Sequence, residues 1–116
     1  EDELPLVGWV FRERWANDNA AAIEGFLRAS DAAKALMLES DAVWEELRPL
    51  MRAENEETFV ALRDGFRAGI PRTTTAEAEG VAKRVFDILA AEGGEALVGK
   101  ARALAPGTFW RGGGGE

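Results

Sequence analysis

Hydrophobic positions recur at helical spacing along most of the chain, and the longest such stretch covers residues 19–38. Ile23, Phe26 and Leu27 are spaced by three or four residues, which places them on one face of a helix. Charged residues such as Arg28 fall on the opposite face. At a rise of about 1.5 Å per residue this helix is about 30 Å long, so it needs other segments to cover its apolar stripe.

Further helices are predicted from the same spacing and from capping residues at their starts. Asn55 precedes two glutamates and is a favourable N-cap residue. Thr74 and Glu77 have the spacing of a capping box, in which each side chain accepts a hydrogen bond from the other residue's backbone N–H. The pattern predicts a helical turn at residues 12–16 and helices at residues 41–48, 56–68, 75–91 and 95–104.

Proline and glycine predict where these helices end. We expect Pro49 to end the helix that begins near Ser40, because the residue before a proline avoids helical backbone angles. Gly69 is a predicted C-terminal cap, and residues 93–94, both glycine, separate the last two helices. The apolar stripes predict a core of Trp15, Ile23, Phe26, Leu27, Trp44, Leu47, Phe59, Leu62, Phe66, Val81, Val85 and Leu89.

Residues 6–11, with the sequence LVGWVF, differ from these helical stretches. A short continuous apolar run rich in valine and aromatic residues favours a buried strand. A single strand cannot pair its own backbone groups. Either its partner strands lie outside this chain, or the segment docks in another way, which includes pairing with a second copy of itself.

Gly8 and Trp9 are the candidate ligand-binding residues of this predicted strand. A glycine inside a strand suggests that another backbone or a ligand approaches closely. Trp9 lies beside it, and aromatic side chains commonly line ligand clefts. For Trp15 and Trp44 core packing is the better interpretation, and we expect Trp110 to anchor the C-terminus.

The composition is that of one folded domain. The chain has 116 residues, of which 47% are hydrophobic, so we expect a single helical domain over residues 1–111 and a flexible glycine-rich tail over residues 112–116. It carries 14 basic and 21 acidic residues, a formal net charge of −7. This balance argues against nucleic acid and anionic membrane surfaces as partners, since both attract basic proteins.

The acidic charge is concentrated in residues 39–57, which hold seven acidic and two basic residues. One interpretation is a docking surface for a basic partner. The other is a solvated helix face with acidic residues at helix N-termini, and we favour it because charge runs are usually solvated.

The chain has no cysteine, histidine or tyrosine, which removes most common catalytic groups. Serine–histidine and cysteine–histidine pairs are excluded, and so are zinc sites built from histidine or cysteine. Acidic pairs are the remaining candidates, but their spacing does not make them converge. We therefore expect no enzyme, no catalytic residues, no metal and no cofactor; the pairs considered are Glu45 with Glu46, Glu77 with Glu79, and Glu92 with Glu95.

Six short motifs follow one another in a familiar order. They are F-x-E-x-W-A-x-x-N at residues 11–19, G-F-L-R-A at 25–29, W-x-x-L-x-P-L-M at 44–51, L-R-D-G-F-R-A-G-I-P at 62–71, G-G-E-A-L-V-G-K-A at 93–101 and P-G-T-F-W at 106–110. This order resembles the C-terminal portion of periplasmic substrate-binding proteins of ABC importers, of the nitrate/sulfonate/taurine type. The resemblance spans residues 6–110.

The resemblance implies a piece of a two-lobed α/β fold, the periplasmic-binding-protein type II fold. Residues 6–11 would be the last crossover strand, and the helices would pack on the outside of the first lobe. Only Gly8 and Trp9 would reach the ligand cleft. The implied function is delivery of a small polar or anionic solute, such as a sulfonate or nitrate, to an ABC permease. The implied location is the periplasm; a signal peptide is not among these residues, and we expect the chain to be a fragment of a longer protein.

A different interpretation is a free-standing helical interaction module. The isolated strand and the surplus of apolar residues motivate it, since two copies could pair their strands and share a core as a homodimer. In the solute-binding interpretation, Arg12 and Arg14, just after the strand, are the candidate residues for contact with an anionic solute, although surface pairing with Glu13 or Asp18 is the better interpretation of them.

Overall fold

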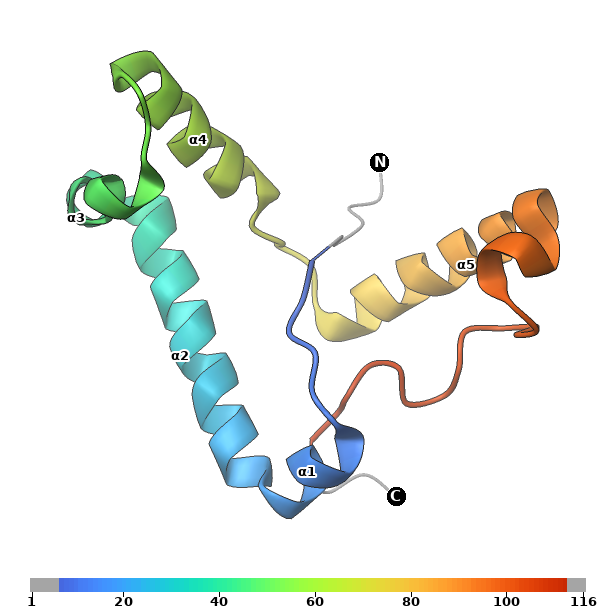
Figure 1. Cartoon of the computed structure of the whole chain (residues 1–116). Coiled ribbons are helices and arrows are strands. Elements are labelled where there is room, and N and C mark those ends of the chain that lie inside the picture. Colours follow the sequence, from blue (N-terminus) through green and yellow to red (C-terminus); the bar gives the residue numbers. More distant parts are fainter. Residues whose placement is uncertain (1–6, 113–116) are drawn as a thin grey trace. The chain divides into compact units, whose positions relative to one another are not determined.

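The computed structural model describes residues 7–112, and this part of the chain is mainly helical, as predicted. Its backbone contacts divide it into two units, which are described separately: Ala21–Ile70, and a second unit that combines the residues up to Ala20 with those from Pro71 onward. No helix within residues 7–112 combines the length and the apolar content of a membrane span. The helices are α1 (Glu13–Asp18), α2 (Ala20–Glu39), α3 (Asp41–Met51), α4 (Glu56–Gly69) and α5 (Thr75–Val98) (Figure 1).

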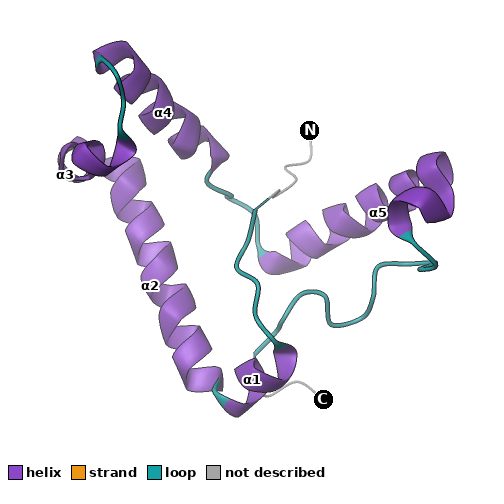
Figure 2. Ribbon diagram, in the orientation of Figure 1, coloured by secondary structure: helices purple, strands orange, loops and turns teal. Residues whose placement is uncertain are grey.

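The predicted strand at residues 6–11 is wrong for the part that the structure describes. Residues 7–12 form a loop that leads into α1, and no strand is present among residues 7–112 (Figure 2). A strand needs a neighbouring strand to bond its backbone N–H and C=O groups, and the described residues offer none. Leu6 lies outside the described residues, as do residues 113–116 of the predicted tail.

The break between α2 and α3 lies where it was predicted. Ser40 has extended backbone angles, φ −114° and ψ 115°, so the helix is interrupted for one residue and α3 begins at Asp41. Asn55 caps α4 as expected, since its Oδ1 accepts a hydrogen bond of 2.8 Å from the backbone N–H of Thr58. The extended backbone at Ser40 and the capped start at Asn55 divide residues 20–69 into three helices.

Pro49 does not end α3, contrary to the prediction. The helix continues for two residues to Met51 and ends at Arg52, whose φ is 52°. The missing N–H of Pro49 removes one helical hydrogen bond, and the helix ends two residues later. The prediction for Gly69 is wrong by one residue, because Gly69 is still helical and Ile70 is the C-terminal cap, with its N–H bonded to the carbonyl of Arg67.

The capping box at the start of α5 is confirmed, with both reciprocal hydrogen bonds between Thr74 and Glu77 present. The predicted break at residues 93–94 appears as a kink at Gly94, with φ 53° and ψ −150°, angles that side chains disfavour. The helix beyond it is shorter than predicted. It ends at Val98 instead of residue 104, because Gly99 has φ 66° and caps it.

The core is smaller than the apolar stripes predicted. Ile23, Trp44 and Phe59 are buried as expected, and Leu27, Leu47, Val81 and Val85 are partly buried. Buried positions outside the predicted core list include Ile70 and the small residues Ala16 and Ala78. Among the described residues α3 and α4 form the most extensive helix–helix contact, so large parts of the other apolar stripes stay accessible. The predicted core residues that are instead exposed are Trp15, Phe26, Leu62, Phe66 and Leu89.

Candidate functional site

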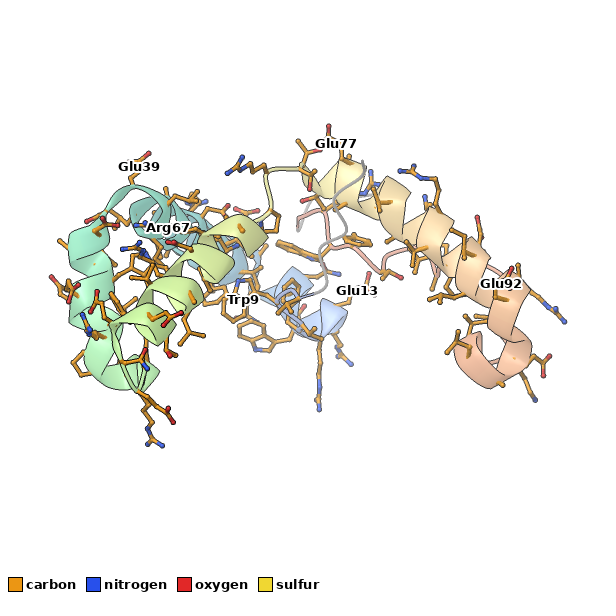
Figure 3. The ribbon with its side chains drawn as sticks, turned by 90° about the horizontal axis from the view of Figure 1, so that it is seen from above. Trp9, Glu13, Glu39, Arg67, Glu77 and Glu92 are labelled. Atoms are coloured by element: carbon orange, nitrogen blue, oxygen red, sulfur yellow. The ribbon has the colours of Figure 1, made fainter. Side chains whose placement is uncertain are left out.

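The candidate ligand residues Gly8 and Trp9 lie in the loop before α1 (Figure 3). The Trp9 side chain is 58% exposed. A methyl group added at Gly8 would meet no atom within 4 Å, so the close neighbour that a strand glycine suggested is not present within the described residues. The loop therefore presents Gly8 and Trp9 at an accessible surface, and their ligand-binding role stays a prediction.

Arg12 and Arg14 follow this loop and are both exposed. Arg12 occupies the N-cap position of α1, and Arg14 lies in its first turn. The first turn also holds Glu13, an acidic residue at a helix N-terminus, where the helix dipole favours negative charge. The stretch of residues 8–14 thus contains two aromatic side chains, Trp9 and Phe11, and two guanidinium groups.

Three acidic residues of the segment 39–57, Asp41, Glu45 and Glu56, form ion pairs with arginines. Asp41 Oδ1 lies 2.8 Å from Arg67 Nη2 and 3.7 Å from Arg63 Nη1. The hydrogen bond from Arg67 holds the pKa of Asp41 below its usual value. Arg48 pairs with Glu56, and its Nη1 lies 3.4 Å from Glu45 Oε2. These pairs favour the interpretation of solvated helix faces over that of a docking surface for a basic partner.

The carbonyl of Met37 joins α2, α3 and α4. It lies in the last turn of α2, and the interruption at Ser40 takes away the backbone N–H that would otherwise bond it. Two side chains replace that donor: Trp44 Nε1 at 2.7 Å and Arg67 Nε at 2.8 Å. Figure 3 shows Arg67 extending from α4 toward the end of α2. One backbone oxygen thus receives donors from both following helices.

Aromatic contacts surround this carbonyl. The Trp44 side chain is only 3% exposed, and its ring meets Phe66 edge-on with 5.5 Å between centroids. The Arg67 guanidinium lies 5.8 Å from the Trp44 ring, and that of Arg48 lies 4.2 Å from the ring of Phe59. We call Met37, Trp44, Phe66 and Arg67 the Met37 junction. Its two donors, Trp44 Nε1 and Arg67 Nε, both bond to the Met37 carbonyl, so the role of the junction is structural.

The predicted acidic pairs take part in caps and ion pairs. Glu77 belongs to the capping box, which lowers its pKa through the Thr74 backbone N–H. Glu79 pairs with Arg111 and, at 3.2 Å, with Lys83. Glu95 lies 4.0 Å from Arg102. Within residues 7–112, no three acidic side chains converge to hold a metal ion.

Trp110 anchors the C-terminal region, as predicted. Its Nε1 donates a 3.0 Å hydrogen bond to Asn17 Oδ1 in α1, and its ring meets Phe11 edge-on. Sequence reasoning identified this tryptophan but not its partners. It also missed the Met37 junction, because a backbone carbonyl leaves no mark in the residue types; the break at Ser40 was the only available signal. Neither the comparison with protein-family models nor the comparison with curated proteins gives a match for this chain.

Proposed function

We propose that this chain is the C-terminal part of the solute-binding component of an ABC importer, acting in the periplasm with an ABC permease. The ordered motifs from residues 11–19 to 106–110 support this proposal, and so does the mainly helical structure. In the whole protein the ligand would be a small polar or anionic solute such as a sulfonate or nitrate. The proposed role includes no catalysis and no cofactor.

The observation that carries the proposal is the exposed apolar surface of the loop before α1. Val7 and Val10 are 90% and 96% exposed, although valine is among the residues most often buried. The run has the composition of a buried strand and has no ladder partner within residues 7–112. A sheet in the rest of a two-lobed α/β protein would supply that partner, which is the arrangement proposed for residues 6–11.

The helices show the same feature. Leu36, Leu50 and Ile88 are exposed leucine and isoleucine side chains on α2, α3 and α5. Large apolar side chains scattered singly are ordinary, but here they occur on helices that already have an apolar stripe. Helices of this kind suit the outside of a lobe, where one face packs on a sheet. The proposed function of the chain is therefore mainly a scaffold, with Gly8 and Trp9 as its contribution to the cleft.

Calorimetry on the full-length protein tests this proposal. The panel is nitrate, a series of alkyl sulfonates including taurine, and thiamine-pathway precursors. We expect saturable heat with one class of solute, and we expect Trp9→Ala to weaken binding while Trp15→Ala leaves it unchanged. Trp15 is the matched control because its ring is exposed on α1, outside the candidate segment. Heat with no member of the panel would contradict the proposal.

The second candidate is the free-standing helical module that forms a homodimer. The same exposed Val7 and Val10 favour it, since two extended segments can pair edge to edge. Sedimentation of the 116-residue chain separates the two candidates. A dimer that Val10→Asp dissociates supports the module, whereas a monomer at all concentrations rejects it and leaves the solute-binding proposal standing.

A further inference from the structure

The last described residues of the chain contact the stretch that carries the candidate ligand residues. We propose that Trp110 and Arg111, called the C-terminal clasp below, are positioning residues for residues 8–9, because they tie the region around α1 to α5. The inference rests on the proposed function only for the ligand-binding role of Gly8 and Trp9. The clasp itself is defined by contacts within one unit of the structure.

Trp110 provides two of these contacts. Its indole Nε1 donates a hydrogen bond of 3.0 Å to Asn17 Oδ1, across a sequence separation of 93 residues. Its ring lies 5.6 Å from that of Phe11, centroid to centroid, at an interplanar angle of 87°. This edge-on geometry is the favourable one for two aromatic rings. Phe11 follows Trp9 by two residues, so the loop is held at its C-terminal end.

Arg111 provides the contact with α5. Its guanidinium pairs with Glu79, whose side chain is largely buried and also pairs with Lys83 in the next turn. The carboxylate of Glu79 therefore lies between two cations, one from its own helix and one from the clasp. Neighbouring residues of the clasp thus face different elements, Trp110 toward α1 and Arg111 toward α5.

A turn at residues 105–108 precedes the clasp and directs the chain back toward α1. The segment after α5 returns to α1, as Figure 1 shows. Thr108 closes the turn, since its backbone N–H and its hydroxyl both bond to the carbonyl of Ala105, at 3.2 Å and 2.7 Å. Pro106 and Gly107, which has φ 79°, suit the second and third positions of a type II turn. The proline–glycine pair therefore fixes where the following tryptophan and arginine point.

Hydrogen exchange of the 116-residue chain, followed by mass spectrometry, tests the clasp without any ligand. In Trp110→Ala, we expect the amides of residues 13–19 to exchange about tenfold faster, because an aromatic pair and a hydrogen bond are lost. Arg111→Ala is expected to increase the exchange rate of the amides in the first turns of α5 by a similar factor. The amides of α4 serve as the internal reference, and they should keep the wild-type rate in both variants.

Two control variants keep the test specific. Phe109→Ala removes the ring next to Trp110. Arg102→Ala removes an arginine whose side chain is 90% exposed and whose ion-pair contact with Glu95 is long, at 4.0 Å. Both should leave residues 13–19 at the wild-type rate. If Trp110→Ala unfolds the chain, Trp110→Phe provides the milder test, since it removes the N–H donor and keeps an aromatic ring against Phe11. Unchanged exchange in residues 13–19 with Trp110→Phe and Trp110→Ala would overturn the proposal.

A binding readout distinguishes positioning from general stability. In the full-length protein, Trp110→Phe is expected to weaken solute binding several-fold at a temperature where the protein remains folded, while Arg102→Ala has no effect. Failure to find any solute would count against the proposed function and leave the exchange result to decide the clasp. Conversely, solute binding with unaltered exchange in the Trp110 variants would support the function and reject the clasp.

Discussion

Each of the two units is stabilised by internal contacts, and the contacts in one unit span a different sequence range from those in the other. In Ala21–Ile70, the donors to the Met37 carbonyl come from residues that are 7 and 30 positions away in the sequence. In the other unit, the hydrogen bond between Trp110 and Asn17 spans 93 positions. Closing a longer loop costs more chain entropy, although the cost grows slowly with length. The first unit can therefore form from one continuous stretch, whereas the second needs both ends of the chain.

The two tryptophans at these contacts, Trp44 and Trp110, differ in how deeply they are buried. Trp44 is almost fully buried, while Trp110 is half-buried at the end of a loop. A buried ring in a well-packed site contributes both apolar area and its hydrogen bond, and a half-buried ring contributes less of each. We infer that the Met37 junction is the stronger of the two, and the following changes test that inference from the largest expected effect to the smallest.

Trp44→Ala is expected to have the largest effect. It removes the buried ring, its contact with Phe66 and one of the two donors to the Met37 carbonyl. Truncation of a buried aromatic residue costs about 3–5 kcal/mol of unfolding free energy. Urea denaturation followed by circular dichroism measures it. Trp15→Ala is the control, with an expected loss below about 1 kcal/mol, and equal losses in the two variants would disprove the role of the junction.

Gly94→Ala should be the next most destabilising change. Gly94 has φ 53° and ψ −150°, a region that is essentially reserved for glycine, so an added Cβ costs about 1–3 kcal/mol. Gly65→Ala is the matched control within α4, where the Cβ would meet no atom within 4 Å. There alanine should stabilise the protein by about 0.5–1 kcal/mol. Thermal unfolding measures both effects: the midpoint temperature should fall for Gly94→Ala and rise for Gly65→Ala. A shift in the same direction for both variants would contradict a glycine-specific conformation at Gly94.

Arg67→Ala removes the second donor to the Met37 carbonyl and the ion pair with Asp41. We expect a loss of about 1–2 kcal/mol in urea denaturation, because the carbonyl keeps its bond from Trp44. The Arg67→Ala/Trp44→Phe double variant sharpens the comparison, since it leaves the carbonyl with neither donor. The double variant should lose more than the sum of the two single losses; strict additivity would mean that the shared acceptor does not couple the two residues.

The smallest effect concerns pH. Hydrogen bonds from Arg67 and from Arg111 lower the pKa of Asp41 and of Glu79 in the folded protein. A lowered folded pKa gives stability that is present above the unfolded carboxyl pKa, about 4, and that is lost as the pH falls through the lower folded value. The urea midpoint should therefore decrease below about pH 4. Asp41→Asn and Glu79→Gln should each flatten this decrease, and a midpoint that rises on acidification would contradict the assignment.

Much of the secondary structure was predictable from the sequence, because caps and breaks have clear residue signatures. Asn55, the Thr74–Glu77 box and the kink at Gly94 are all local in origin. The extent of the core was not predictable. An apolar stripe shows which face of a helix is hydrophobic, but it does not show how much of that face a neighbour covers, so Phe66 and Leu89 were expected to be buried and are exposed.

The candidate site was predictable only in part. Trp110 stood out as an aromatic anchor, but its partners Asn17 and Phe11 lie at the other end of the chain, and sequence spacing does not report such contacts. The strand prediction failed for residues 7–11, the described part of that segment, because strand formation depends on a neighbour, which residue types alone do not supply. Pro49 lies within α3, which continues only two residues beyond it, so the proline indicated the end of the helix only approximately.

Hydrogen exchange of Trp44→Ala and Trp110→Ala in parallel tests the central claim, that separate sets of contacts hold the two units. We predict two different patterns: Trp44→Ala increases the exchange rate most for the amides of α3 and α4, and Trp110→Ala increases it most for the amides of residues 13–19. The opposite result is one common pattern, in which both variants accelerate the same amides by the same factor. That outcome would mean that the chain unfolds as one cooperative body, and it would contradict the claim that the two units are stabilised by separate contacts.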